Sequence, residues 1–339
     1  MARFRLLLLP GLALAAGFLG AATRDSGPVL EVGGHRFLWQ DDWGRSPEAP
    51  EWGNTHGAVL IRSGGELLFN TDTEAAVVEL TPGGELRRRF GKDWKGGLHG
   101  MALVVRDGEE RLYVAHTALH EVAWMDLEGR VLGRRGWPEE CGHYQAAGEY
   151  RPTAVAVAGD GSFYVADGYG RGFIHHFAAD GAWIRSWGGP GEEPGRFRTP
   201  HGVFLHRRQD GERLIVADRE NHRLQVFDLE GRFLQEVKAG LRRPCGVAEW
   251  QEGGLLVVAD LAGRITLLDE DYRLIGHLGD QPDPSLRARN GVPREVWRPG
   301  EFLAPHSACF DREGNLYVLD WLSSGRITRL KRLRPEEEG

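Results

Sequence analysis

A four-strand unit that recurs along the chain constrains the fold more than any other feature of the sequence. Its clearest copy spans residues 200–237, where short apolar runs rich in β-branched and aromatic residues are separated by gaps rich in Asp, Gly and Asn. The runs lie at 203–206, 213–217, 223–227 and 232–237. Near-alternation within such short runs is typical of strands joined by hairpins. Because stacked repeats form one continuous body, the 339 residues need not divide into several domains.

Six copies of this unit predict a closed ring of blades. The copies begin at His56, His99, Pro152, Pro200, Pro244 and Pro305. The last copy ends after its third run, at 326–330, and the segment 35–43 is a spare strand near the N-terminus. Pairing this strand with the last blade removes the open sheet edge. We therefore expect an all-β fold, a six-bladed β-propeller over residues 35–332 whose ring is closed by the N-terminal strand. The alternative, an open β-solenoid, does not explain the displaced strand.

The segments that flank the predicted propeller suggest an exported protein. Residues 1–22 have the pattern of a secretory signal peptide, with two arginines, an apolar stretch at 6–19 and small residues before a cleavage point. The apolar stretch is too short for a stable membrane span, and the alternative is an uncleaved anchor. Residues 23–34 are expected to be a linker and 333–339 a C-terminal tail. The expected location is secreted or periplasmic, with no membrane span after cleavage.

Charge and cysteine content exclude some classes of protein. The 42 Lys and Arg residues against 49 Asp and Glu residues give a net charge of −7 without a basic stripe, which argues against nucleic acid as a partner. Cys141, Cys245 and Cys309 are an odd number of cysteines, so the chain is not a disulfide-framework protein. Two alternatives remain open for Cys245, namely a bridge to Cys141, which needs Cα atoms within about 7 Å, and a free thiol.

One position of the repeat collects histidines. If the first strand of each blade runs down the central channel from the top face, the residue just before that strand lies at the channel mouth. In chain order this position is occupied by His56, His99, Thr153, His201, Cys245 and His306, so it holds four of the 13 histidines. The second, fourth and sixth blades alternate around the ring, so a rough three-fold axis should relate His99, His201 and His306.

Three imidazoles that converge on an axis match a zinc site with one position open for water or substrate. Iron, copper or cobalt would fit the same ligands. The alternative is that His99, His201 and His306 only cap strand ends and line a solvated channel. The roles of His56 and Cys245 are not determined by the pattern.

The loops between second and third strands should lie on the same face as this ring. An aspartate recurs there in four blades, as Asp167, Asp218, Asp260 and Asp320, which indicates turn capping through side-chain to backbone bonds. Tyr169 and Arg219 do not recur, so they are candidate substrate residues. The alternative is that Arg219 pairs with Asp167 while Tyr169 packs on a connector. Long connectors at 137–151, 188–198 and 280–303 should open on this face and could wall a pocket.

The motifs resemble a known repeat and, more closely, a known enzyme domain. Tyr-Val-Ala-Asp-Gly-Tyr-Gly at 164–170, the segment 216–227 and the Pro-His-Gly starts resemble NHL repeats. Over about residues 50–332 the chain resembles the lyase domain of peptidylglycine α-amidating enzymes. The resemblance implies a zinc-containing six-bladed propeller that cleaves peptidyl-α-hydroxyglycine into a peptide amide and glyoxylate.

The resemblance also implies roles for particular residues. It makes His99, His201 and His306 the zinc ligands, Tyr169 the active-site tyrosine and Arg219 an active-site arginine. The chain departs from the family at four positions. Thr71 replaces a second arginine, and Ser307 replaces an aspartate that helps to hold a calcium ion. Ala304 replaces a methionine, and Gly170 replaces a disulfide cysteine. A structural calcium is therefore less expected than zinc.

Three functions follow from these features. The first is an exported, zinc-dependent carbon–nitrogen lyase that acts on a peptidyl-α-hydroxyglycine or a related α-hydroxy acid at the channel mouth. In it Tyr169 is the candidate acid/base and Arg219 the anion clamp. The second is a non-catalytic NHL propeller that binds a protein, peptide or glycan on its top face. The third, a lactonase-type hydrolase, ranks last because calcium prefers carboxylate and amide ligands, which the ring positions lack.

Overall fold

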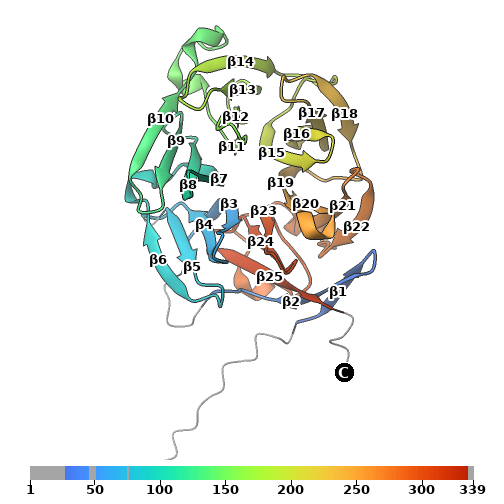
Figure 1. The fold of residues 1–339 in the computed structure, drawn as a ribbon. Helices are drawn as coiled ribbons and strands as arrows, with labels where there is room; N and C mark the ends of the chain where they lie inside the picture. Colours follow the sequence, from blue (N-terminus) through green and yellow to red (C-terminus); the bar gives the residue numbers. More distant parts are fainter. Residues whose placement is uncertain (1–26, 46–50, 75, 335–339) are drawn as a thin grey trace, which may run out of the picture.

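The computed structural model describes residues 27–45, 51–74 and 76–334. Within this part of the chain, 25 strands form six antiparallel sheets arranged as blades around a central channel (Figure 1). The predicted six-bladed β-propeller is confirmed. The predicted signal peptide of residues 1–22 lies outside the described residues. No helix in the described ranges is both long enough and apolar enough to span a membrane.

Five blades each take their four strands from one continuous stretch of chain. The first contains β3(Thr55–Ile61), β4(Leu67–Thr71), β5(Val77–Leu80) and β6(Leu86–Phe90), and the second contains β7(Leu98–Arg106), β8(Glu109–His116), β9(Glu121–Asp126) and β10(Val131–Gly136). The third contains β11(Ala154–Val157), β12(Phe163–Ala166), β13(Phe173–Phe177) and β14(Trp183–Gly188). The fourth contains β15(Pro200–Arg208), β16(Gly211–Asp218), β17(Arg223–Phe227) and β18(Phe233–Val237), and the fifth β19(Pro244–Trp250), β20(Leu255–Asp260), β21(Arg264–Asp269) and β22(Leu274–Leu278).

Short 3-10 turns interrupt the connections between strands. They are η1(Lys92–Trp94), η2(Glu139–Cys141), η3(Ala147–Glu149), η4(Arg219–Asn221), η5(Gln251–Gly253), η6(Pro284–Leu286) and η7(Arg294–Val296). Within blades the connections are tight hairpins, such as that between β17 and β18, where Gly231 adopts the expected positive φ of 85°.

The sixth blade joins the two ends of the described chain. Its strands are β23(Pro305–Phe310), β24(Leu316–Asp320), β25(Arg326–Leu333), β2(His35–Gln40) and β1(Val29–Val32). The N-terminal strand β2 pairs antiparallel with β25, with Trp39 opposite Leu330, as the closure scheme predicted. Figure 1 shows β1 and β2, in blue, beside the red β25. The outer edge of β25, the third strand of the sixth blade, is therefore paired, and the ring is closed.

The assignment of residues 23–34 to a linker was wrong for their second half. Residues Val29–Val32 form β1, which pairs with β2 through a turn at Gly33 and Gly34, where φ is 56° and 80°. Leu30 and Val32 pack against the core between the fifth and sixth blades. A four-residue strand carries too little alternation for its pattern alone to predict it.

The hydrophobic core lies between blades rather than within them. Each of the six largest buried clusters joins residues of two neighbouring sheets, because the two faces of a blade both pack on other blades. At the closure, Phe37 and Trp39 of β2 are fully buried against strands of the fifth and sixth blades. One blade cannot bury its faces alone, so the top-face residues of different blades are positioned by the whole ring.

Candidate metal centre and active site

A β-bulge near the top of the first strand aims the ring residues into the channel. In the fourth blade Pro200 pairs with Asp218 while Gly202 pairs with Ala217, so His201 is the extra residue. The same register shift occurs at Cys245 and at His306. A bulge bends the strand and redirects its side chain. We expected each ring residue just before a first strand. Thr153 does lie directly before β11, but the other five ring residues lie inside their strands.

The three predicted metal ligands converge as a nearly equilateral set. The imidazole centroids are 4.8 Å apart for His99 and His201, 5.1 Å for His99 and His306, and 4.7 Å for His201 and His306. All three side chains are buried, with at most 3% of each residue exposed. Burial lowers the pKa of each imidazole well below its usual value, so each is neutral, which is the form that binds a metal.

Backbone carbonyls of the next blade orient these imidazoles. Nδ1 of His99 lies 2.6 Å from the Thr153 carbonyl oxygen, and Nδ1 of His201 lies 3.0 Å from that of Cys245. Nδ1 of His306 lies 3.0 Å from the carbonyl oxygen of Gly57. Because a carbonyl oxygen can only accept, each Nδ1 carries the hydrogen and the lone pair of each imidazole is on Nε2. This donor set, with its outer hydrogen bonds, fits a zinc ion or a similar metal.

Two further ring residues lie beside the triple. Ligand atoms of His56, His99 and His306 lie within 4.8 Å of one another, and so do those of His201, Cys245 and His306. Of the three predicted ligands, His99 thus belongs to the first group, His201 to the second and His306 to both. Burial raises the pKa of the Cys245 thiol to about 12, and the nearby Arg219 charge opposes this effect. All three cysteines are free, so the bridge between Cys141 and Cys245 is not formed.

Tyr169 and Arg219 lie over one edge of the histidine ring. The Tyr169 hydroxyl is 3.3 Å from Nε2 of His99 and 3.1 Å from Nε2 of His201. Arg219 Nη1 donates to the same hydroxyl at 3.2 Å, and its guanidinium carbon lies 5.4 Å from the tyrosine ring centroid. Burial raises the pKa of Tyr169, although the Arg219 charge acts in the opposite direction. The structure therefore brings all five predicted site residues together.

The alternative pairing of Arg219 with Asp167 was wrong. Arg219 Nε donates to Glu220 at 2.8 Å. The Asp167 carboxylate instead accepts the backbone N–H groups of Arg151 and Arg171, at 2.7 Å and 2.6 Å. Arg219 thus faces the ring rather than a blade aspartate.

The recurring aspartates hold the chain that leads into each first strand. Each carboxylate accepts a backbone N–H from the residues just ahead of that strand. The bonds are Arg151 to Asp167 at 2.7 Å, Arg198 to Asp218 at 2.7 Å, Arg242 to Asp260 at 3.0 Å and Ala304 to Asp320 at 2.7 Å. The predicted capping role is confirmed. Because the ring residues follow two or three positions later, these aspartates also position the ring.

A buried hydrogen-bond chain behind Tyr169 was not predicted. The Tyr144 hydroxyl donates to Asp167 at 2.7 Å and lies 2.6 Å from Nε2 of His175, whose Nδ1 lies 2.7 Å from the Ser186 hydroxyl. Tyr144 belongs to the connector 137–151, so this connector supports the loop that carries Tyr169. The connector 280–303 packs through Val292, Trp297 and Leu303 against Leu322 in the loop after β24. A single tyrosine in a loop carries no sequence pattern that could have revealed its role.

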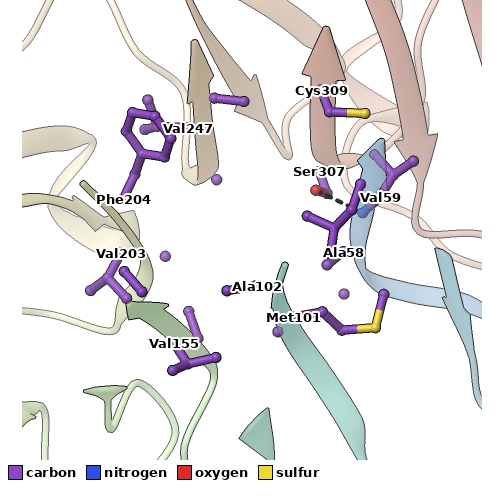
Figure 2. Close-up of a pocket in the computed structure, with 18 of the residues that line it drawn as sticks. Ala58, Val59, Met101, Ala102, Val155, Val203, Phe204, Val247, Ser307 and Cys309 are labelled. Carbon is purple, nitrogen blue, oxygen red and sulfur yellow. Dashed lines mark hydrogen bonds between the residues drawn. The ribbon is translucent and has the colours of Figure 1, made fainter. Parts of the chain in front are cut away.

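A cavity of about 400 Å³ lies along the channel on the other side of the ring. It begins at the histidines and follows the first strands toward Arg207, Glu249 and Gln251. Figure 2 shows largely apolar side chains around it, including Met101 and Val155. The Ser307 hydroxyl accepts the Val59 N–H at 3.2 Å, as the dashed line in Figure 2 marks. Ser307 therefore ties the sixth blade to the first.

Comparisons with known proteins give a repeat family and several sequence relatives of this chain. The NHL repeat model matches residues 197–227. Peptidyl-glycine alpha-amidating monooxygenase B of Xenopus laevis is 31% identical over 237 residues, which are 66% of this chain and 25% of the relative. A probable peptidyl-alpha-hydroxyglycine alpha-amidating lyase of Caenorhabditis elegans is 31% identical over 193 residues, 55% of this chain and 49% of the relative. The chain thus spans about a quarter of the first relative and about half of the second.

Solved structures support the fold alone. A gluconolactonase from Xanthomonas campestris matches with a TM-score of 0.59 at 15% identity, over 92% of this chain and 99% of that one. At this identity the likeness says nothing about the reaction. The sequence relatives and the site geometry, rather than the structural neighbours, bear on function.

Proposed function

We propose that this NHL-repeat propeller, a homologue of the peptidyl-α-hydroxyglycine α-amidating lyases, is a metal-dependent lyase that cleaves a peptidyl-α-hydroxyglycine or a related α-hydroxy acid. The observation that carries the proposal is the contact of the Tyr169 hydroxyl with Nε2 of both His99 and His201 and with Arg219. The contact supports the proposal because it joins a hydroxyl suited to proton transfer and a guanidinium suited to anion binding to two of the proposed metal ligands.

The residues that would hold the metal are His99, His201 and His306, through Nε2. A zinc ion bound there would polarise a substrate oxygen and lower the pKa of its hydroxyl group. The hydrogen bonds from Nδ1 to the carbonyl oxygens of Thr153, Cys245 and Gly57 leave Nε2 of each imidazole unprotonated before any ligand arrives. The fold thus sets the tautomer of each histidine, and this tautomer, in addition to the residue type, supports metal binding through Nε2.

Arg219 and Tyr169 would bind the substrate and move its proton. The Arg219 guanidinium is a planar fork suited to the substrate carboxylate, and Glu220 holds it through Nε at 2.8 Å. In the reaction the substrate hydroxyl loses its proton, a carbonyl forms, the carbon–nitrogen bond breaks and the amide nitrogen gains a proton. Tyr169 stands where it could take the first proton and return it to the nitrogen. The products balance as a primary amide and glyoxylate.

Metal analysis tests the ligand set. Wild-type protein reconstituted with zinc and dialysed should retain about one ion per chain. The double variant His99→Ala/His201→Ala should retain none and keep its β-sheet circular dichroism, because the ligands sit at a channel mouth outside the blade cores. The matched double variant His35→Ala/His143→Ala, outside the ring, should retain zinc as the wild type does. Wild-type protein that holds no metal would overturn the metal-dependent lyase.

A glyoxylate assay separates the lyase from a non-catalytic binding propeller. Zinc-loaded protein offered a peptidyl-α-hydroxyglycine should release glyoxylate above the metal-free control. Metal binding without any release would reject the lyase reaction and favour the propeller that binds a protein, peptide or glycan on its top face.

We also propose that the protein is exported to a secreted or periplasmic location. The support is the signal-peptide pattern of residues 1–22. N-terminal sequencing of protein expressed with its full N-terminus should find Thr23 as the first residue. An intact N-terminus on protein recovered from the cell interior would contradict export.

A further inference from the structure

We propose that Cys245 is a ligand of the same metal, supplying a thiolate on the side of His201 and His306. The inference rests on the proposed metal site and adds to it a donor that the three-histidine scheme lacks. It would make the centre one of mixed nitrogen and sulfur ligands.

The position of Cys245 in the ring carries the proposal. It is the extra residue of the bulge between Pro244 and Gly246, which is the same structural position that His201 and His306 occupy in their blades. Its residue is 2% exposed, and its sulfur lies within 4.8 Å of the ligand nitrogens of His201 and His306. Ligand atoms around one tetrahedral zinc are about 3.5 Å apart, so closing the group requires each separation to shorten by no more than about 1 Å.

A second contact ties Cys245 to the metal ligands. Its backbone carbonyl oxygen accepts the hydrogen of His201 Nδ1 at 3.0 Å. The same residue thus orients one imidazole through its carbonyl and presents a sulfur beside that imidazole. The bulge makes both possible, because it directs the side chain into the channel while the carbonyl stays at the blade contact.

The simplest alternative is that Cys245 is a small apolar residue packed near Leu261 and Ala304. The other two cysteines do pack in this way, as small side chains in apolar clusters. Cys309 lies in the core between the sixth and first blades, and Cys141 lies in a connector. Within the described residues, neither belongs to a group of possible metal ligands, whereas Cys245 does.

A thiolate donor has two consequences for the centre. Coordination would release the thiol proton to solvent, so the ion would gain one negative ligand and the site would shift toward metals that favour sulfur. Three imidazoles and one thiolate would also fill a tetrahedral shell, so a substrate oxygen would have to add as a fifth ligand or displace the sulfur. Cys245 would therefore set a balance between metal retention and substrate access.

X-ray absorption of the zinc-loaded protein, with zinc as the only added ligand, tests the proposal. Wild-type protein should show one sulfur at about 2.3 Å beside nitrogen neighbours at about 2.0 Å. Cys245→Ala and Cys245→Ser should lose the sulfur neighbour, while the control Cys141→Ala keeps it. Circular dichroism checks that the variants fold. If neither Cys245 variant folds, the X-ray absorption spectrum of the wild-type protein still shows whether sulfur is bound to the zinc.

The outcomes separate this proposal from the one it rests on. A wild-type shell of nitrogen and oxygen alone, which includes a shell completed by His56 instead, overturns the role of Cys245 and leaves the histidine site standing. A sulfur neighbour that persists in Cys245→Ala also overturns it. Protein that retains no zinc overturns both proposals.

Discussion

At the scale of single residues, the site depends on which nitrogen of each imidazole is free. Hydrogen bonds from Nδ1 to backbone carbonyls leave Nε2 of His99, His201 and His306 for a ligand. The Tyr169 hydroxyl then lies between His99 and His201, while His56 lies beside His99 and His306, and Cys245 lies beside His201 and His306. The three edges are therefore chemically different.

The role of Tyr169 predicts a specific kinetic change. Tyr169→Phe should lower kcat for glyoxylate release by about 10²- to 10⁴-fold, because a proton-transferring group is lost while the metal ligands remain. Zinc content and KM should change little. Tyr164→Phe is the control, since it removes a buried hydroxyl of the same blade that bonds the Leu229 carbonyl at 3.0 Å. Equal rates for both variants would discard the role of Tyr169.

Asp167 predicts a pH dependence of stability. Burial raises its pKa from 3.8 to about 6, against hydrogen bonds from Arg151 and Tyr144 that lower it. Between these values the folded state binds more protons than the unfolded state, so this carboxyl's contribution to stability falls as pH rises through that window. The free energy of unfolding of wild type relative to Asp167→Asn should therefore drop by about 2–3 kcal/mol from pH 4 to pH 7.

Asp160 should show the opposite pH dependence of the free energy of unfolding. Hydrogen bonds from Ser162 lower the pKa of the Asp160 carboxyl. Its stabilising contribution is present above the unfolded pKa and is lost as pH falls through the folded value. Wild type relative to Asp160→Asn should therefore gain stability as pH rises. Stability differences that change with pH in the same direction for both variants would contradict one of the two assignments.

At the scale of elements, the bulged first strand and the aspartate that ends the second strand act as one unit. In the fourth blade the buried Asp218 accepts the Arg198 N–H at 2.7 Å and the Arg223 Nε–H at 2.7 Å. It thereby holds the residues ahead of His201 and the start of β17 together. The same loop carries Arg219, so one carboxylate positions groups on both sides of the proposed site.

Removing that carboxylate should damage both stability and metal binding. Asp218→Ala leaves the buried Arg223 charge with Glu236 as a partner and should cost about 3 kcal/mol, measured by urea unfolding. Zinc affinity should fall about 10- to 100-fold, as for other outer hydrogen bonds of metal sites. Asp228→Ala, in an exposed turn of the same blade, should cost about 1 kcal/mol or less and leave affinity unchanged. Unchanged zinc affinity in Asp218→Ala would separate this aspartate from the site.

At the scale of the whole molecule, the closure of the ring sets the distances between blades. Pairing of β2 with β25 is reinforced by Arg326, which is fully buried and bonds Asp41 through Nη2 at 2.8 Å. Arg294 Nη1 bonds Asp42 at 2.6 Å beside this pair. These contacts join residues from opposite ends of the described chain, so the sixth blade, which carries His306, depends on the N-terminal strand.

Deletion of the closing strand should therefore destabilise the entire ring. Loss of residues 27–43 removes the buried Phe37 and Trp39, and truncation of each such side chain costs about 3–5 kcal/mol. That loss is comparable with the whole stability of a typical domain, so thermal unfolding should move far down or lose cooperativity. Deletion of residues 27–33 alone removes only β1 and should have a much smaller effect. A protein lacking 27–43 that melts at the wild-type temperature would refute this closure.

The sequence by itself determined the parts that depend on local periodicity. Alternation over a few residues, glycine turns such as Gly231 and the count of repeats predicted the blades and the displaced strand β2. The recurrence of one position placed His99, His201 and His306 on one face, because equivalent residues of stacked repeats share a level. Tyr169 and Arg219 were candidates because they do not recur in the repeat, and the family resemblance gave them active-site roles.

Tertiary structure decided the rest, because one-residue register shifts and contacts between distant segments leave no periodic signal. The bulge at His201 exists only through pairing of β15 with β16, so the position inside the strand could not be predicted. The support of Asp167 by Tyr144, and the approach of Cys245 to His306, join residues that only blade packing brings together. Sequence pattern reports which way a side chain faces along its own strand, whereas closure of the ring determines what it meets there.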